Sequence, residues 1–314
     1  MSASTVAVAL TGLSRRFGDV SAVSDLSFEV SRGELFGLVG PDGAGKTTTL
    51  RMLAGVLRPS AGDALVAGVS VARNPEGVKP HIAYMSQRFG LYGDLTVREN
   101  IDFYADLYGV PRHVRTDRLK RLYEFSALGP FENRLASNLS GGMKQKLSLC
   151  CALIHQPDVM LLDEPTFGVD PISRRDLWLI VHEMVASGTT VLVSTAYLDE
   201  AERCDRVVLL HGGRAIAIDS PDALRQLLAR NIFTVRTNDP RRTAALLNRA
   251  EHAKRAALFG DTVHITFDDQ ERDWPRAEAV LRANQIDVLE AGPAEPSLED
   301  VFIELVVSRG DSNG

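Results

Sequence analysis

The chain has 314 residues, of which 45% are hydrophobic, 24% charged and 6% aromatic. This length indicates about two domains, and the composition excludes a disordered, collagen-like or disulfide-stapled chain. The formal net charge is -6, from 35 Lys and Arg against 41 Asp and Glu, which argues against nucleic acid as a partner. Three cysteines cannot make a disulfide framework and indicate a reducing compartment.

Membrane insertion and secretion are not expected. The richest apolar runs, such as residues 159–162 and 207–210, have the length of strands and stay far below the 18 residues of a membrane span. The amino terminus lacks a basic segment followed by an apolar block, so the sequence predicts no secretion signal.

The first part of the chain predicts strands that lead into a glycine-rich turn. Alternating apolar residues at 6–10 and 28–30 predict two half-buried strands, and residues 34–39 predict a third. The pattern changes to a helix from Lys46 to about residue 54, and Gly55 ends it.

A helical insertion is predicted at about residues 89–155. A strand at residues 82–85 precedes it, and Thr96 with Glu99 forms a T-x-x-E capping box at the start of its first helix.

Strands return at residues 159–162, 191–194 and 207–210. Between the first two lies a helix that Asp170 can cap, with Pro171 in its first turn. Continuous apolar strands that alternate with helices predict a parallel sheet covered on both faces.

The organisation changes after a further cap and proline at Ser220 and Pro221. We place a domain boundary near residue 230, which gives a first domain at residues 1–230 and a small α/β domain at residues 231–314. In the second domain, strands are predicted at 232–236, 263–267 and 286–289, and helices at 241–249, 276–284 and 297–307.

The most specific motif lies between the third strand and its helix. It fits G-x-x-x-x-G-K-[ST] and consists of Gly40, Pro41, Asp42, Gly43, Ala44, Gly45, Lys46 and Thr47, followed by Thr48. Glycines let such a loop fold around a polyphosphate, so that amide N–H groups and the positive end of the helix face it. Lys46 supplies a charge for the terminal phosphates, and the Thr47 hydroxyl can ligate Mg²⁺.

Two carboxylates end the strand at residues 159–162. Asp163 can hold a Mg²⁺-bound water, and Glu164 can polarise the water that attacks a γ-phosphate. Taken alone, this pair could be a solvated strand end; behind a phosphate loop it favours phosphoryl chemistry.

A second phosphate-binding helix start lies between these motifs. Ser140 can cap the helix that follows Leu139, and Gly141 and Gly142 allow close backbone approach.

At this point the sequence resembles the ATP-binding cassette (ABC) family, over residues 1 to about 230. The resemblance implies an α/β P-loop fold with a parallel core sheet, an antiparallel β subdomain and a helical insertion. It also implies an ATPase that works as a head-to-tail dimer, in which the element at Ser140 to Gly142 closes over ATP held by the opposite subunit.

Further site residues follow from the resemblance alone. Phe17 is expected to stack on adenine, Gln87 to ligate Mg²⁺ and sense the γ-phosphate, and the loop at residues 168–170 to cross the dimer interface. Core packing for Phe17 and a turn role for Gln87 remain alternatives. Lys46, Glu164 and Gln87 are then the expected catalytic residues.

The tail after residue 230 resembles the extension of exporters with ABC-2-type permeases, through the segment at residues 296–305. The phosphate loop is similar to the first cassette of the YbhF-type tandem proteins. The resemblance implies a cytoplasmic subunit on the inner face of the membrane, docked to a separate permease through the region at residues 89–97. The rivals are a soluble cassette ATPase that acts on ribosomes or DNA and a catalytically weak regulatory module.

Two positions depart from the family pattern. Ala196 stands where a histidine usually contacts the γ-phosphate, and the loss of one such donor costs about 3 kcal/mol, or roughly a hundredfold in rate. Tyr197 is not expected to substitute, because its side chain leaves the strand on the opposite face. Asp42 stands where asparagine is usual and adds negative charge near the phosphates. The chain either pairs a slow site with a different cassette or forms a homodimer with modest turnover.

Overall fold

The computed structural model describes residues 5–87, 90–228, 232–250 and 253–310. The chain divides into two compact units, one up to Ile218 and the other from Asp219 onward. Each unit has its own apolar core. Within the described ranges, no helix combines the length and the apolar character needed to cross a bilayer.

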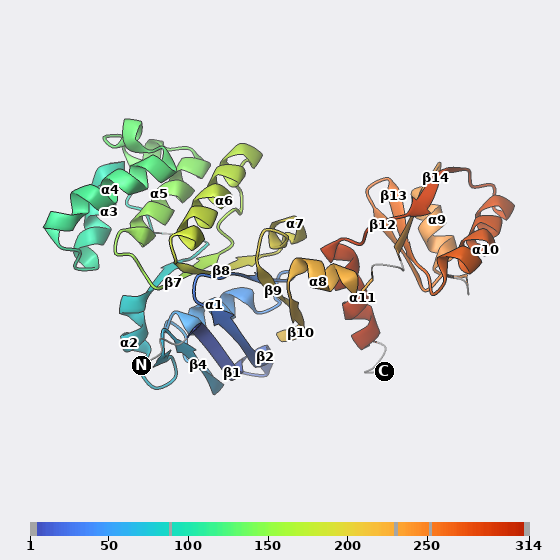
Figure 1. Ribbon diagram of the computed structural model, residues 1–314, viewed down its shortest axis with the longest axis horizontal. Helices are drawn as coiled ribbons and strands as arrows, with labels where there is room; N and C mark the ends of the chain where they lie inside the picture. The colour runs from blue at the N-terminus through green and yellow to red at the C-terminus, as the bar shows by residue number, and fades with distance from the viewer. Residues whose placement is uncertain (1–4, 88–89, 229–231, 251–252, 311–314) are drawn as a thin grey trace. The chain divides into compact units, whose positions relative to one another are not determined.

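An antiparallel sheet forms one layer of the first unit (Figure 1). Its strands, in the order β2-β1-β4-β5, are β1 (Val6–Phe17), β2 (Val20–Ser31), β4 (Ala61–Val66) and β5 (Val69–Ser70). β1 and β2 run longer than their apolar alternation predicts, because they remain paired as far as Phe17 and Val20. β4 escaped prediction because Gly62 and Asp63 are poor strand formers, and its pairing with β1 holds it in place.

The second sheet of this unit carries the continuous apolar runs. Its strands, in the order β10-β9-β3-β8-β7-β6, are β3 (Leu35–Val39), β6 (Ile82–Met85), β7 (Val159–Asp163), β8 (Thr190–Thr195), β9 (Arg206–His211) and β10 (Arg214–Asp219). β3 pairs in parallel with β8 and β9, and β7 pairs in parallel with β6 and β8. The predicted parallel sheet is confirmed.

Helices cover this parallel sheet on both faces, as predicted (Figure 1). On one face, α1 (Lys46–Leu53) and the antiparallel sheet share an apolar cluster that includes Leu50 and Leu161. On the other face, α5 (Gly141–Leu153) contacts β6, and α6 (Pro171–Ala186) contacts β8. Because the strands are parallel, their carboxyl ends meet at one edge of the sheet, between the layer that contains α1 and the layer that contains α5 and α6.

The helical insertion has its own core. Its helices α3 (Val97–Leu107), α4 (Arg112–Ser126) and α5 pack through an apolar cluster that includes Ile101 and Leu147. The capping box of Thr96 and Glu99 is confirmed, and Phe89, where we expect the insertion to begin, lies outside the described residues. Shorter helices of this unit are α2 (Pro75–Val78), α7 (Leu198–Ala201) and the 3₁₀ turns at Lys79–His81, Gly129–Phe131 and Ala136–Asn138.

The second unit is a small α/β domain with one antiparallel sheet in the order β12-β13-β11-β14. Phe233, Val263 and Leu281 belong to its core. Ser220 caps its first helix, as predicted. Its elements are α8 (Pro221–Gln226), β11 (Ile232–Thr237), α9 (Pro240–Leu247), β12 (Arg255–Phe259), β13 (Thr262–Thr266), α10 (Gln270–Ala283), β14 (Val288–Pro293) and α11 (Leu298–Gly310).

One helix of this unit begins earlier than the sequence predicts. α10 starts at Gln270 rather than near Arg276, and it continues through Pro275. Asp269 caps it by accepting a hydrogen bond from the Arg272 N–H at 3.2 Å. Pro275 leaves one backbone hydrogen bond of the helix unmade, and the side-chain cap at Asp269 marks where the helix begins.

Candidate functional site

The glycine-rich loop joins the carboxyl end of β3 to the first turn of α1, and two of its glycines are required by space. A Cβ atom at Gly40 would lie 2.2 Å from the carbonyl oxygen of Leu210, and one at Gly45 would lie 2.6 Å from that of Ala22. Gly45 has a φ of 99° at the N-cap, and no side chain caps α1. The first N–H groups of α1 therefore face outward as anion donors.

Lys46 lies across the mouth of this loop with only 4% of its side chain exposed. Its ammonium donates to the carbonyl oxygens of Gly40 at 2.8 Å and Pro41 at 3.1 Å. It also forms an ion pair with Glu164, with 3.3 Å between Nζ and Oε1. The ammonium group that we expect to contact the phosphates is thus bound by the loop carbonyl groups and by Glu164.

Asp163 ends β7 with 1% exposure and accepts hydrogen bonds from three hydroxyl groups. Thr47 donates to it at 2.9 Å, Ser194 at 2.8 Å and Tyr84 at 3.1 Å. Burial and the neighbouring carboxylate raise the pKa of Tyr84 to about 12, so its hydroxyl remains a donor. These three donors satisfy the oxygen atoms of the buried carboxyl group.

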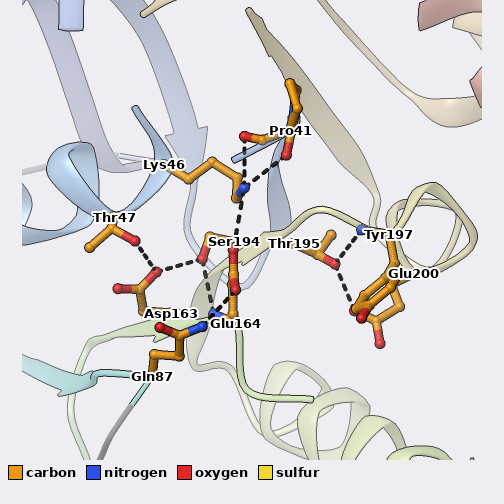
Figure 2. Close-up of polar contacts among 11 residues, drawn as sticks. Pro41, Lys46, Thr47, Gln87, Asp163, Glu164, Ser194, Thr195, Tyr197 and Glu200 are labelled. Carbon is orange, nitrogen blue, oxygen red and sulfur yellow. Dashed lines mark hydrogen bonds and ion pairs between the residues drawn. The ribbon is translucent and has the colours of Figure 1, made fainter. Parts of the chain in front are cut away.

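Glu164 follows directly and has a left-handed φ of 49°. Its N–H donates to Ser194 Oγ at 3.0 Å, and its Oε2 accepts from Gln87 Nε2 at 3.0 Å. This conformation is strained for a residue other than glycine, and such strain is common at functional sites, where it fixes the direction of a side chain. The bend directs Glu164 between Lys46 and Gln87, as Figure 2 shows.

The structure thus brings together five of the predicted site residues: Lys46, Thr47, Gln87, Asp163 and Glu164. Ser194 and Tyr84 also belong to this group and were missed. Parallel pairing sets Ser194 opposite Asp163, which a correct strand order could have indicated. Tyr84 lies in the neighbouring strand and gives no signal of its own in the sequence.

Other predicted residues lie apart from this group. Phe17 is 47% exposed, and the guanidinium of Arg15 lies 4.6 Å from its ring centre. Ser140 is exposed and caps α5, where its Oγ accepts from the Met143 N–H at 3.3 Å. No contact given for the described residues joins Ser140 to Gly142 with the phosphate loop of the same chain.

The element at Ser140 is close to the loop at residues 168–170. A Cβ atom at Gly142 would lie 2.2 Å from Ser173 Oγ. Asp170 caps α6, as predicted, by accepting from the N–H groups of Ile172 at 3.1 Å and Ser173 at 3.0 Å. Hydrogen bonds from the Ser173 backbone and side chain hold the pKa of Asp170 below its usual value, so its carboxylate is charged at neutral pH.

Of the two departures from the family pattern, Ala196 follows the end of β8 and Asp42 lies in the phosphate loop. Ala196 is exposed and has no polar side-chain atom to offer a phosphate. Tyr197 turns toward Glu200 in Figure 2, and the guanidinium of Arg174 lies 4.9 Å from its ring centre. Asp42 is exposed in the phosphate loop.

The residues present fit a magnesium nucleotide. Mg²⁺ prefers oxygen ligands, and a hydroxyl at Thr47, a carboxylate at Asp163 and an amide at Gln87 supply them. A buried ammonium and the open N–H groups of α1 match the negative charge of a polyphosphate.

Comparisons with known proteins agree with this geometry. A family model described as ABC transporter matches residues 23–167, and one described as the C-terminal domain of DrrA1-3-like ATP-binding proteins matches residues 220–306. The chain is 43% identical over 310 residues to the probable multidrug ABC transporter ATP-binding protein YbhF of Escherichia coli, covering 97% of this chain and 53% of that protein. It therefore spans about half the length of this relative.

Other similar proteins match along most of their length. The chain is 36% identical to the Nod factor export ATP-binding protein I of Rhizobium etli, covering 95% of this chain and 93% of that protein. A solved structure of an ATP-binding subunit of an ABC transporter has a TM-score of 0.64 and 33% identity, covering 70% of this chain and 92% of that one.

A phosphate loop beside a strand that ends in Asp163 and Glu164 defines the class of α/β P-loop ATPases. The chain belongs to the ABC transporter family. Its second unit is of the DrrA-like C-terminal type.

Proposed function

We propose that this chain binds ATP with Mg²⁺ at residues 40–47 and hydrolyses it to drive export through a separate ABC-2-type permease. The observation that carries the proposal is the contact of Lys46, Glu164 and Gln87 beside the pair formed by Thr47 and Asp163. When bound, Mg²⁺ supplies positive charge to the phosphate oxygens of the substrate.

Each residue of the site then has a task. Lys46 leaves Glu164 and contacts the terminal phosphates, while the N–H groups of residues 43–48 surround them. Freed from Lys46, Glu164 orients and polarises the attacking water. Thr47, Asp163 and Gln87 hold the metal. Phe17, which is exposed, supplies the surface on which adenine stacks.

The hydrolytic site is proposed to be slow because of Ala196. The segment after β8 offers no side-chain donor at this position, and Tyr197 is engaged with Arg174. One missing donor to developing charge corresponds to roughly a hundredfold in rate. A slow site favours a chain that works beside a more active cassette; a homodimer of modest turnover and a weak regulatory cassette are the alternatives.

A second cassette is proposed to complete the site. Ser140, Gly141 and the α5 helix start form an exposed anion-binding surface that the phosphate loop of the same chain does not use. A head-to-tail dimer brings this surface over the nucleotide of the opposite cassette.

The permease is proposed to dock on aromatic side chains that follow Gln87 in the chain. Tyr92 and Phe103 are 48% and 37% exposed, with ring centres 4.6 Å apart, and Phe103 lies 5.5 Å from Tyr104. Large exposed aromatic side chains of this kind are enriched at protein interfaces. Docking there would place the protein on the cytoplasmic face of the membrane, and Gln87 would connect it to the catalytic carboxylate.

The boundary between the two functional domains is proposed to lie at residue 230. Residues 1–230 act as the cassette and residues 231–314 as the accessory domain, although the second compact unit already begins at Asp219. The relatives are named for different cargoes, Nod factor in one case and multiple drugs in another. We therefore propose that the permease, and not this chain, selects the transported substrate.

Release of phosphate from ATP by the purified chain tests the hydrolytic part of this proposal. We expect slow Mg²⁺-dependent turnover that falls at least a further tenfold in Glu164→Gln, because an amide cannot polarise the water. Glu183→Gln, an exposed change on α6, is the matched control. Equal rates for wild type and Glu164→Gln would contradict the role given to this carboxylate.

A further inference from the structure

Glu200 is a buried carboxylate beside the site that the functions above do not use. It lies in the short helix α7 with 1% exposure. Its Oε2 accepts a hydrogen bond from Thr195 Oγ1 at 2.8 Å (Figure 2). Its Oε1 has no hydrogen-bond partner among the described residues. A buried carboxyl group with so few hydrogen-bond partners is costly to keep, so stability alone does not explain it.

The nearest cation to Glu200 is Arg174, which lies close without forming a hydrogen bond. Arg174 Nε is 3.6 Å from Glu200 Oε1, and Nε likewise has no hydrogen-bond partner within the described part of the chain. The guanidinium is held over the ring of Tyr197. Charge attraction therefore joins α6 to α7 across the end of β8.

Thr195 connects Glu200 to the phosphate loop. Its side-chain oxygen donates to Glu200 and accepts from the Tyr197 N–H at 3.0 Å, which fixes the backbone on either side of Ala196. Its carbonyl oxygen accepts from the N–H of Gly40, the first residue of the phosphate loop, at 3.3 Å. One residue thus joins the buried carboxylate to the loop that carries Lys46.

Arg174 connects Glu200 to the loop at residues 168–170. Its N–H donates to the carbonyl oxygen of Asp170 at 2.9 Å, in the first turn of α6. Asp170 is also the side-chain cap of this helix. Displacement of Arg174 would therefore disturb the start of α6 and the loop before it.

We propose that Glu200 is a positioning residue of the ATPase, which holds the end of β8 against the phosphate loop through Thr195 and against α6 through Arg174. This role rests on the proposed function. With alanine at 196, the end of β8 has no side chain that a phosphate could hold, so its position depends on the carboxylate behind it. Errors of about 1 Å in such a position cost on the order of a hundredfold in rate.

Two matched pairs of variants test the role in the full-length chain. Thr195→Val removes the hydroxyl at constant shape, and Thr195→Ser retains it. Glu200→Gln removes the buried charge, and Asp199→Asn removes an exposed charge from the same helix. The readouts are the single-turnover rate of ATP hydrolysis, the Kd for ATP with Mg²⁺ and the melting temperature.

We expect Thr195→Val and Glu200→Gln to lower the hydrolysis rate at least tenfold while the Kd changes less than threefold. Thr195→Ser should recover at least half of the wild-type rate, and Asp199→Asn should leave it unchanged. A structural role alone would lower the melting temperature without changing the rate per folded molecule. If Glu200→Gln does not fold, the comparison of Thr195→Val with Thr195→Ser decides.

Folded Thr195→Val with a rate within twofold of Thr195→Ser would overturn the positioning role while leaving the proposed function intact. Absence of ATP binding by the wild-type chain in the same experiment would overturn both.

Discussion

At the scale of single residues, the site is built around two neighbouring carboxylates, Asp163 and Glu164, whose side chains have separate partners. Asp163 takes the hydroxyl groups, and Glu164 takes Lys46 and Gln87. Ser194 contacts both residues, through Asp163 Oδ1 and the Glu164 N–H. This arrangement keeps the two neighbouring carboxylates turned to different partners, as the proposed function requires if one is to serve the metal and the other the water.

The residues of the site could be predicted to different degrees. Lys46, Asp163 and Glu164 belong to motifs whose spacing carries their chemistry, and the structure brings them together. Ser194 and Glu200 were missed because their roles depend on contacts across strands and helices. A correct strand order would have placed Ser194 beside Asp163, whereas no local pattern marks Glu200.

Replacing Ala196 by histidine should raise the rate of ATP hydrolysis roughly a hundredfold. The imidazole would restore a hydrogen-bond donor at the end of β8. A rate effect of this size is typical of one hydrogen bond to developing charge. The measurement is phosphate release with and without an added partner cassette. Ala186→His, on α6, is the control for an added imidazole. An unchanged rate in Ala196→His would contradict the account of a weakened site.

At the scale of elements, apolar runs predicted the strands of the parallel sheet best. β6 has the predicted bounds, β7 is one residue longer at its carboxyl end, and β8 is one residue longer at each end. β10 and β12 escaped prediction because they are short segments rich in Ala and Arg, and their strand form comes from pairing with neighbours. Helix starts at Ser140, Asp170 and Ser220 were predictable because a side-chain cap acts within a few residues.

The start of α11 makes the second unit sensitive to acid. Burial favours the neutral form of Asp300, but hydrogen bonds from His264 and Ser297 outweigh it and lower the pKa of Asp300. His264 Nδ1 lies 2.9 Å from Asp300 Oδ1, and the Ser297 N–H donates to Oδ2 at 2.9 Å. Because the folded pKa is depressed, this stabilisation is present above the unfolded value near 3.9 and is lost as the pH falls through the folded value.

Thermal unfolding of the second unit between pH 7 and pH 3 measures this effect. We expect Asp300→Asn to melt at a lower temperature than wild type at pH 7 and the difference between the two melting temperatures to narrow as the pH falls toward 3. Asp261→Asn, an exposed change in the same unit, should follow wild type throughout. A constant difference between Asp300→Asn and wild type across this range would be inconsistent with the depressed pKa.

At the scale of the whole molecule, the site is expected to be shared between two cassettes. The phosphate loop lies at the end of β3, and the element at Ser140 lies at the start of α5 without contact to it among the described residues. ATP binding would join two such surfaces, and hydrolysis would release them.

The mass of Glu164→Gln in solution should double when ATP and Mg²⁺ are added, because nucleotide bound without hydrolysis keeps the two cassettes closed. Light scattering after size exclusion measures it. Ser140→Arg should prevent doubling by crowding the anion-binding helix start, whereas Asn133→Arg, an exposed change in the same insertion, should not. If Glu164→Gln does not dimerise with ATP and Mg²⁺, and a mixture of this variant with a partner cassette does not associate either, the shared site is refuted.

Calorimetric titration of the full-length chain with ATP and Mg²⁺ tests the central claim most directly. We predict saturable binding that is lost, or weakened at least a hundredfold, in Lys46→Ala and is unchanged in Lys79→Ala, which removes an exposed lysine paired with Glu76. No heat of binding in the wild-type chain, or equal affinity in Lys46→Ala, would contradict the account.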